Sequence, residues 1–215
     1  VNSKEHWEKV YTKYNNEELG WFEDDLTQSF KLINQCNLTS NSRIINIGSG
    51  TTLLVDELIK EGLANIIATD ISETANNILA NRINDSSKLT IITDDLTSPN
   101  ALTKIDTVDL WIDRAVLHFF TNENDQNTYF DLLKSKVKNG GYVILAMFAV
   151  GGAEKCSALP IKQYSKEILS KQLGNDFELL DNFDFNYVNP GGHNRPYIYT
   201  LFQKNNYYGF FTKRD

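Results

Sequence analysis

The stretch with the clearest potential for chemistry is Gly48-Ser49-Gly50, which follows the apolar run 44–47 and opens into a helical pattern. Glycines at the end of a buried strand let backbone amides approach a ligand that any Cβ would hold off. Asp70 ends a second apolar run, 66–69, further along the chain. A carboxylate at the tip of the second strand can accept hydrogen bonds from ribose hydroxyls. The pattern therefore predicts a site for a cofactor that contains a nucleoside.

Later apolar runs also end in charged or titratable side chains. Asp95 follows the third run, and Asp113, Arg114 and His118 follow the fourth. His118 is the candidate general base for a protonated nucleophile, because its ordinary pKa of about 6.5 lies near neutrality. A histidine that caps or packs at the strand end is the alternative. Asp113 is a second catalytic candidate, and together with Arg114 it either lines the site or forms a structural ion pair.

The elements that must position these residues are strands and helices that alternate along the chain. The predicted strands cover 44–47, 66–70, 89–93, 108–112 and 142–149. The predicted helices cover 53–61, 73–84, 126–138 and 165–173, and the third is expected to stop at Asn139-Gly140-Gly141. Such alternation predicts right-handed βαβ units and a parallel sheet covered on both faces. The carboxyl ends of the strands then form the ligand crevice.

The pattern changes after the fifth strand. Residues 150–164 form a long loop without clear periodicity, and loops of this length are usually functional or disordered. Two β-rich runs, 177–188 and 197–203, leave no room for a helix between them and predict an antiparallel hairpin at the sheet edge. The whole chain thus predicts an α/β fold with a doubly wound, mostly parallel, seven-stranded sheet and a terminal antiparallel hairpin.

The loop of that hairpin carries polar side chains that could contact a substrate. If the first hairpin strand runs parallel to the other strands, the loop emerges at the cofactor end of the sheet. His193, Asn194 and Arg195 are then candidates for substrate binding. An ordered turn without a ligand is the alternative.

Residues 1–40 join no predicted strand. One predicted helix in this segment carries an apolar stripe of four residues, Trp7, Val10, Tyr11 and Tyr14. A leading helical segment outside the sheet must cover something, so we expect a lid over the cofactor, with Trp21 as one of its cofactor contacts. Aromatic side chains that only pack on the body are the alternative. We expect a single domain with the lid over 1–40 and the core over 41–215.

Composition limits the possible partners. The chain of 215 residues has a net charge of −7, which argues against a nucleic-acid binder because phosphate contacts need a basic face. No apolar run reaches the roughly 20 residues that span a bilayer, and no signal or transit peptide is visible, so we expect no membrane partner and a cytoplasmic location. Cys36 and Cys156 are expected to be reduced, and they lack the spacing of metal ligands, so no metal site is predicted.

Taken together, these motifs resemble a known family. A nicotinamide enzyme normally has a third glycine in Gly-x-Gly-x-x-Gly, and here Leu53 occupies that position, which disfavours a pyrophosphate. The glycine turn, Asp70, Asp95 and the terminal hairpin together resemble the Rossmann-like class I S-adenosylmethionine-dependent methyltransferases over nearly the whole chain. Segment 113–120, Asp-Arg-Ala-Val-Leu-His-Phe-Phe, is similar to a motif of small bacterial methyltransferases whose substrates are mostly unassigned.

The resemblance implies a place for each part of S-adenosylmethionine. The residues expected at its methionine part are Asn46, Gly48, Ser49 and Gly50, and Asp113 and Arg114 are expected on the methionine or substrate side. Asp70 is expected to bind the ribose, and the residues expected at the adenine are Ile71, Asp95 and Leu96. Thr51-Thr52 stand where the family has a further glycine. The Asn/Asp-Pro-Pro-Tyr motif of amino-group DNA methyltransferases is absent after the fourth strand, which counts against nucleobase nitrogens as methyl acceptors.

We therefore expect methyl transfer from S-adenosylmethionine to a small-molecule nucleophile. Such a displacement depends largely on positioning, and it needs a base only when the nucleophile arrives protonated. A protein lysine methyltransferase is the alternative within the family, because an acidic surface attracts a cationic side chain. An NAD-dependent oxidoreductase and a non-catalytic nucleoside-binding module are the alternatives outside it.

Overall fold

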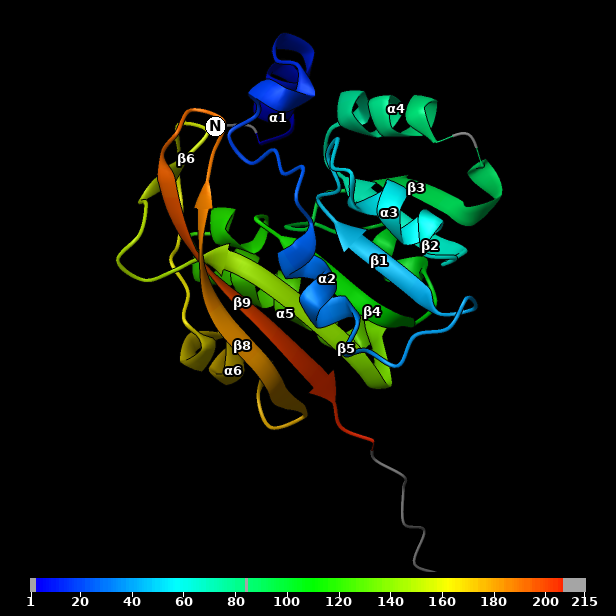
Figure 1. Cartoon of the computed structure of the whole chain (residues 1–215). Helices are drawn as coiled ribbons and strands as arrows, with labels where there is room; N and C mark the ends of the chain where they lie inside the picture. The colour runs from blue at the N-terminus through cyan, green and yellow to red at the C-terminus, as the bar shows by residue number, and fades with distance from the viewer. Residues whose placement is uncertain (1–2, 84, 207–215) are drawn as a thin grey trace, which may run out of the picture.

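A seven-stranded sheet organises the chain in this computed structural model, which describes residues 3–83 and 85–206 (Figure 1). Its strand order is β3-β2-β1-β4-β5-β9-β8. The strands are β1 Arg43–Ile47, β2 Asn65–Asp70, β3 Leu89–Thr93, β4 Val108–Arg114, β5 Val137–Phe148, β8 Phe177–Val188 and β9 Asn194–Lys204. The first five pair in parallel, and β9 is antiparallel to both β5 and β8. The predicted fold class is confirmed.

Helices cover both faces of the sheet (Figure 1). The α-helices are α1 Ser3–Lys13, α2 Thr27–Ile33, α3 Leu54–Lys60, α4 Glu73–Arg82, α5 Glu123–Lys136 and α6 Lys166–Leu173. The 3₁₀ helices are η1 Asn16–Glu18, η2 Ser86–Lys88, η3 Leu102–Lys104 and η4 Leu117–Phe119. In Figure 1, α2 and α3 lie in front of the sheet, and α5 and α6 lie behind it. None of the helices in the described residues is long and apolar enough to span a membrane.

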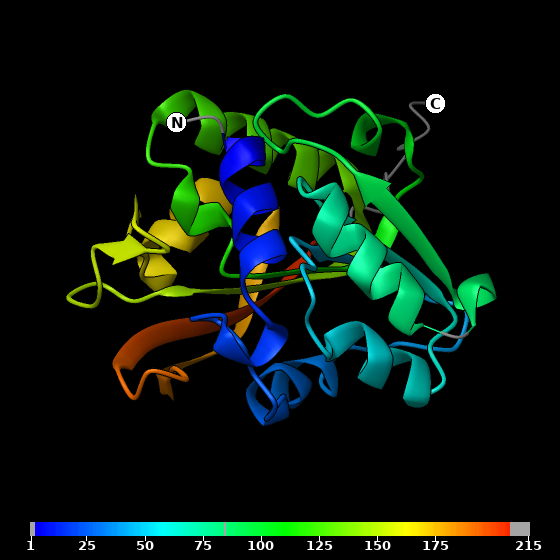
Figure 2. The ribbon, with the colours of Figure 1, turned by 90° about the horizontal axis from the view of Figure 1, so that it is seen from above.

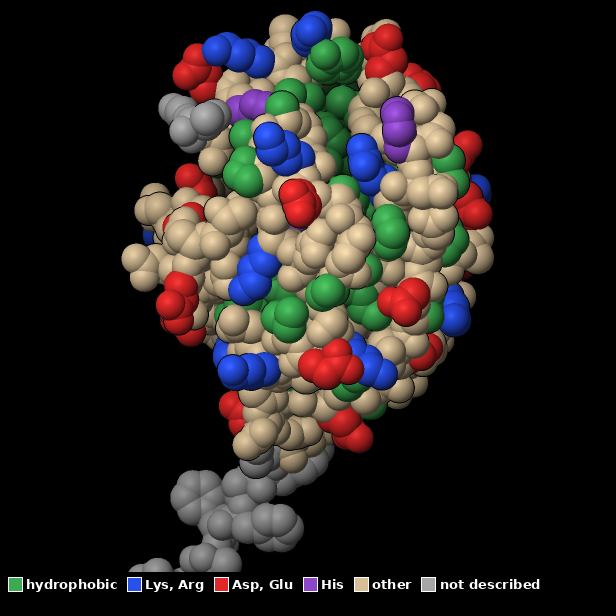
Figure 3. Space-filling model, turned by 90° about the vertical axis from the view of Figure 1, so that its left-hand side faces the viewer, with side chains coloured by type: hydrophobic (Ala, Val, Ile, Leu, Met, Phe, Trp, Pro, Cys, Tyr) green, Lys and Arg blue, Asp and Glu red, His purple; other side chains and the backbone are tan. Residues whose placement is uncertain are grey.

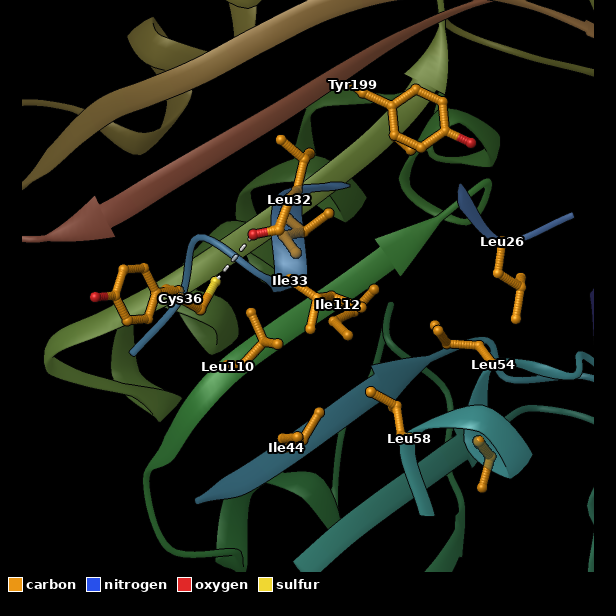
Figure 4. Packing of buried hydrophobic residues seen from close by; sticks show 14 of the residues in the cluster. Leu26, Leu32, Ile33, Cys36, Ile44, Leu54, Leu58, Leu110, Ile112 and Tyr199 are labelled. Carbon is orange, nitrogen blue, oxygen red and sulfur yellow. Dashed lines mark hydrogen bonds between the residues drawn. The ribbon is translucent and has the colours of Figure 1, made fainter. Parts of the chain in front are cut away.

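Successive residues of a strand feed opposite faces of the sheet, which produces two hydrophobic layers. On one face, Ile44 of β1 packs with Leu58 of α3 and Leu32 of α2. On the other, Ile45 packs with Tyr129 of α5. Figure 4 shows the first layer, in which Leu32 and Ile33 of α2 lie close to Leu110 and Ile112 of β4. Because helices cover both faces of the sheet, a site can form only at the ends of the strands.

The hairpin directs its loop toward the carboxyl ends of the parallel strands. Since β8 is antiparallel to β9 and β9 is antiparallel to β5, β8 runs in the same direction as β5. This is the orientation required for the loop to lie at the cofactor end. A smaller hairpin, β6 Lys155–Cys156 and β7 Leu159–Pro160, forms inside the long loop 150–164. Figure 2 shows α1 across this end of the molecule, between α4 and the β6–β7 hairpin.

The boundary between α5 and β5 differs from the prediction. The helix expected over 126–138 ends at Lys136, and β5 begins at once with Val137. Between its pairings with Val108 and Leu110, β5 advances from Val137 to Tyr142, so it bulges. Gly140 lies in this bulge with φ 75°, a left-handed conformation that glycine adopts without strain. The glycine pair that suggested a helix stop therefore belongs to a bulge within the strand.

The helix expected over 73–84 ends at Arg82, and Asn84 lies outside the described residues.

Candidate cofactor and active site

A cavity of about 460 Å³ lies at the carboxyl ends of the parallel strands. Each of the first four strands contributes to its lining through Gly48, Asp70, Asp95 and Arg114, and α1 contributes Trp7. The sheet topology thus brings together most of the residues that the sequence marked as candidates. On this side of the molecule, Figure 3 shows hydrophobic side chains gathered in a hollow in the upper part of the surface.

The turn after β1 requires glycine at two positions. Gly48 and Gly50 have φ of 55° and 50°, in the left-handed region. A Cβ on Gly48 would overlap the side chain of Val116, and a Cβ on Gly50 would overlap the hydroxyl of Tyr11. The turn therefore fits closely between the residues after β4 and the first helix.

Asp70 is buried and already orders this turn. Its Oδ2 accepts a hydrogen bond from the Gly50 amide at 2.9 Å, and its Oδ1 accepts one from the Ser72 amide at 2.9 Å. Burial raises its pKa to about 6, against the opposing effect of these amides. Each carboxylate oxygen has a second lone pair. Asp70 can thus accept further hydrogen bonds from a ligand in the cavity that it lines.

Thr97 anchors Asp95 through one of its two carboxylate oxygens, and no side-chain partner of the other is found among the described residues. Its Oδ1 accepts hydrogen bonds from the amide and the hydroxyl of Thr97, at 2.8 Å and 2.7 Å. Ile71 and Leu96 line the cavity beside it. A flat heterocycle with an exocyclic amino group could pack against Ile71 and Leu96 and donate a hydrogen bond to Asp95.

Polar atoms without partners cluster around the glycine turn. Asn46 Nδ2, Ser49 Oγ, Thr69 Oγ1 and Arg114 Nη2 are buried, and none has a hydrogen-bond partner among the described residues. Each of these residues lines either the large cavity or a neighbouring one of about 40 Å³ on the other side of Gly48. Because buried polar groups are nearly always paired, this cluster fits a polar ligand with both donors and acceptors.

Arg114 joins the end of β4 to the amino-terminal segment. Its Nε pairs with Glu23 Oε2 at 3.0 Å, and its Nη1 donates to the Trp21 carbonyl at 3.0 Å. The ring centroids of Tyr187 and Tyr197 lie 5.0 Å and 5.3 Å from the guanidinium carbon. The guanidinium is therefore fixed in place, and its unpaired Nη2 remains for a ligand group.

The comparisons with known proteins agree with this geometry. Residues 45–145 match a family model described as a methyltransferase domain. The chain therefore carries a methyltransferase domain and has the fold of the class I, S-adenosylmethionine-dependent enzymes. The predicted family resemblance is thereby confirmed, and the likeness of segment 113–120 to a narrower motif stays a prediction. No curated protein is significantly similar in sequence to this methyltransferase.

Solved structures share the fold of this methyltransferase at low sequence identity. A SAM-dependent methyltransferase from Anabaena variabilis has a TM-score of 0.75 and 14% identity, over 95% of this chain and 96% of that one. The N-methyltransferase NodS from Bradyrhizobium japonicum, in complex with S-adenosylhomocysteine, has a TM-score of 0.70 and 13% identity, over 95% and 99%. The 1,6-didemethyltoxoflavin-N1-methyltransferase from Burkholderia thailandensis has a TM-score of 0.67 and 15% identity, over 95% and 85%.

The two residues predicted to be catalytic in this methyltransferase are buried beneath the cavity. Asp113 is fully buried and does not line it, and its carboxylate accepts hydrogen bonds from the Val116 and Leu117 amides and from the Tyr129 hydroxyl, at 2.9, 3.1 and 2.7 Å. These contacts hold the turn after β4, while burial raises the pKa of Asp113 to about 7. A catalytic role for Asp113 stays a prediction, and the structure describes it as the anchor of this turn.

His118 lies in the same turn with its ring in the core. It is fully buried and does not line the cavity, and its ring lies 4.4 Å from that of Phe119 and 4.8 Å from that of Phe148. Neither ring nitrogen has a partner among the described residues. Burial, assisted by the charge of Arg114, lowers the pKa of His118 to about 3. The role of His118 as a base or in substrate binding stays a prediction.

The hairpin-loop candidates lie outside the cavity lining. The His193 side chain is exposed, and that of Arg195 is partly exposed. Neither lines the large cavity, although the charge of Arg195 acts on Cys156, which does. Their role in substrate binding also stays a prediction.

The sequence did not predict the roles of Glu8 and Glu23, two carboxylates that bind the amino-terminal segment of the methyltransferase to the rest of the chain. Their partners come from elements far along the chain, so no local spacing marks them. The sole sequence signal for Glu8 is its position beside Trp7 on the predicted lid helix.

Proposed function

We propose that this methyltransferase transfers a methyl group from S-adenosylmethionine to a small-molecule nucleophile. The observation that carries this proposal is the cavity of about 460 Å³, whose lining joins the carboxylates Asp70 and Asp95 to the aromatic rings of Trp7 and Phe119. Sites for small ligands typically measure roughly 300–1,000 Å³ and are mostly apolar with a few convergent polar groups.

Different residues around the cavity are assigned to different parts of the cofactor. We assign the ribose to Asp70 and the adenine to the surface formed by Ile71, Asp95 and Leu96. The residues assigned to the methionine part are Trp21, Asn46, Gly48, Ser49, Gly50 and Arg114. The unpaired Nη2 of Arg114 is suited to a carboxylate, because a guanidinium and a carboxylate form strong charge-assisted hydrogen bonds.

S-adenosylmethionine held by these residues would supply a methyl group on a sulfonium, whose transfer to the lone pair of an acceptor would leave S-adenosylhomocysteine. The protein's own contribution is to orient the acceptor and exclude water. The rings of Trp7 and Phe119, 5.0 Å apart and nearly perpendicular, form the apolar side of the cavity together with Leu159 and Pro160. A proton on the acceptor passes to water or to a base.

Two of the similar structures support a small acceptor. One is described as an N-methyltransferase with bound 1,6-didemethyltoxoflavin, a small molecule, and NodS is also described as an N-methyltransferase. We also propose that residues 1–40 act as a lid. In support, Trp7 and Tyr11 of α1 line the cavity, and Trp21 follows them from the same segment.

Calorimetry tests the cofactor assignment. We expect S-adenosylmethionine and S-adenosylhomocysteine to bind with micromolar affinity and NAD not to bind. Binding of NAD and neither sulfur nucleoside would favour an oxidoreductase and refute the proposal.

A labelled-methyl screen over thiols, phenols, amines and lysine peptides tests the acceptor. Transfer to a small molecule is the expected result. Transfer to lysine peptides alone would favour a protein lysine methyltransferase, and binding of the cofactor without any transfer would favour a non-catalytic module.

A further inference from the structure

One carboxylate of α1 binds the first turn of α4 instead of its own helix. Glu8 Oε1 accepts a hydrogen bond from the Glu73 amide at 2.6 Å, and its Oε2 accepts them from the Thr74 amide at 3.2 Å and the Ser72 hydroxyl at 3.1 Å. Ser72 is the N-cap of α4, and its oxygen in turn accepts from the Ala75 amide at 3.1 Å. The first amides of a helix lack partners within the helix. Here two of them depend on a residue of α1.

The same contact leads directly to the carboxylate assigned to the ribose. The Ser72 amide donates to Asp70 Oδ1, and the Gly50 amide donates to Asp70 Oδ2, both at 2.9 Å. A continuous series of hydrogen bonds therefore connects Glu8 through Ser72 and Asp70 to the glycine turn. Glu8 is thereby connected to a carboxylate that lines the cavity.

The opposite side of α1 covers the cavity. Trp7 and Tyr11 line it, and the Trp7 ring packs edge to face against Trp21 at 5.4 Å and Phe119 at 5.0 Å. Figure 2 shows α1 lying across the end of the sheet beside α4. Movement of α1 away from α4 would therefore separate Glu8 from these amides and Trp7 from the cavity.

We propose that Glu8 is a positioning residue that keeps α1 closed over the bound cofactor. In the closed position, a charged acceptor satisfies two amides at the positive end of the α4 dipole, where an anion is favoured. In the open position, those amides and the carboxylate return to water. We call the contacts of Glu8 with Ser72, Glu73 and Thr74 the latch. The identity of the ligand rests on the proposed function, and the latch rests on the observed contacts.

Binding of S-adenosylhomocysteine to the variant Glu8→Gln tests the latch. The amide side chain keeps the shape of Glu8 but removes the charge, and its NH2 group replaces the acceptor of either the Glu73 amide or the Thr74 amide and the Ser72 hydroxyl. We expect the dissociation constant to rise at least tenfold, mainly through faster dissociation measured by stopped-flow fluorescence. The matched control is Glu17→Gln, which removes the same charge from an exposed position of the same segment. Its constants should stay within twofold of those of the wild type.

Hydrogen exchange separates the latch from a merely structural role. We expect the amides of Glu73 and Thr74 to exchange faster in Glu8→Gln than in the wild type, and S-adenosylhomocysteine to slow their exchange in the wild type. A structural role would lower the melting temperature of the free variant and leave its dissociation rate unchanged, and that result overturns the proposal.

The exchange measurement also covers two other outcomes. If the wild type binds no S-adenosylhomocysteine, the proposed function fails, and equal exchange at these two amides in the variant and the wild type overturns the latch. If Glu8→Gln does not fold, hydrogen exchange of the wild type with and without S-adenosylhomocysteine tests the proposal. Exchange at Glu73 and Thr74 that the ligand leaves unchanged overturns the proposal.

Discussion

The carboxylate of Asp70 offers the most direct test of the cofactor site. In Asp70→Asn, one oxygen remains an acceptor and the other becomes an amide donor that faces either the Gly50 or the Ser72 amide. Hydrogen bonds to a charged group contribute about 1.5–3 kcal/mol and neutral ones about 0.5–1.5 kcal/mol. With one ribose hydroxyl losing its acceptor and the other losing the charge, we expect a loss of about 2–3 kcal/mol, or about 30- to 150-fold in affinity for S-adenosylhomocysteine.

The pH dependence makes this test more specific. Because burial raises the pKa of Asp70 to about 6, the free protein carries a protonated Asp70 at pH 5. Ribose hydroxyls that donate to the carboxylate favour its ionised form, so affinity should fall about tenfold between pH 7 and pH 5 in the wild type. Asp70→Asn should lose this dependence. Asp106→Asn, whose side chain is 85% exposed at the opposite end of β4, should keep it.

Calorimetry over this pH range is the assay, with circular dichroism to confirm that the fold persists. A wild-type affinity that does not change with pH, or an Asp70→Asn variant that binds as tightly as the wild type, would remove Asp70 from the ribose and refute the reasoning.

Two further substitutions test the turn after β4. Arg114→Lys should weaken S-adenosylhomocysteine binding and destabilise the fold by about 3 kcal/mol. The reason is that an ammonium cannot bind Glu23 and the Trp21 carbonyl together and still present a free donor. An unchanged melting temperature and an unchanged affinity, both measured by fluorimetry, would contradict this. Ala115 has φ 75°, so Ala115→Gly should raise the free energy of unfolding by about 1 kcal/mol in urea denaturation, whereas Gly48→Ala should lower it. A destabilised Ala115→Gly would show that the conformation of this turn carries no strain.

The order of elements could be predicted because local patterns determine it. Apolar runs with intervening helical patterns specify parallel strands, because the helical crossovers then cover both faces of the sheet. The start of β5 could not be predicted in this way. The sequence Asn139-Gly140-Gly141 is typical of a helix end, but pairing of Val137 with Val108 makes the strand begin earlier, and the glycines form its bulge.

The site shows the same division between local and long-range determinants. The glycine turn and Asp70 could be recognised because they follow directly from the ends of β1 and β2. The burial of His118 could not, because Phe148, which encloses its ring, lies thirty positions further along the chain, on β5. The Glu8 latch likewise joins residues more than sixty positions apart. Side chains whose partners come from other elements acquire their roles only when the chain folds.

His118 remains the residue whose role most needs a measurement. Its pKa is lowered to about 3 by burial and by the charge of Arg114, whereas a histidine in the unfolded chain has a pKa of about 6.5. A lowered folded-state pKa gives stability that is present above pH 6.5 and is lost as the pH falls toward 3, by up to about 5 kcal/mol. His118→Phe removes this titration and two unpartnered buried nitrogens, and it adds a ring that suits the space between Phe119 and Phe148.

We therefore expect His118→Phe to be more stable than the wild type at pH 5 in urea denaturation. Asp70 and Asp113 have raised pKa values, so the stability that they contribute is lost as the pH rises through about 6 and 7. Both residues are present in the variant and in the wild type, so the difference between the two free energies of unfolding at each pH excludes this contribution. Turnover decides the chemical role. A base at this position requires a loss of more than about 100-fold in kcat with unchanged affinity for S-adenosylhomocysteine. A stable variant that keeps its turnover across the pH range would show that the imidazole serves packing alone.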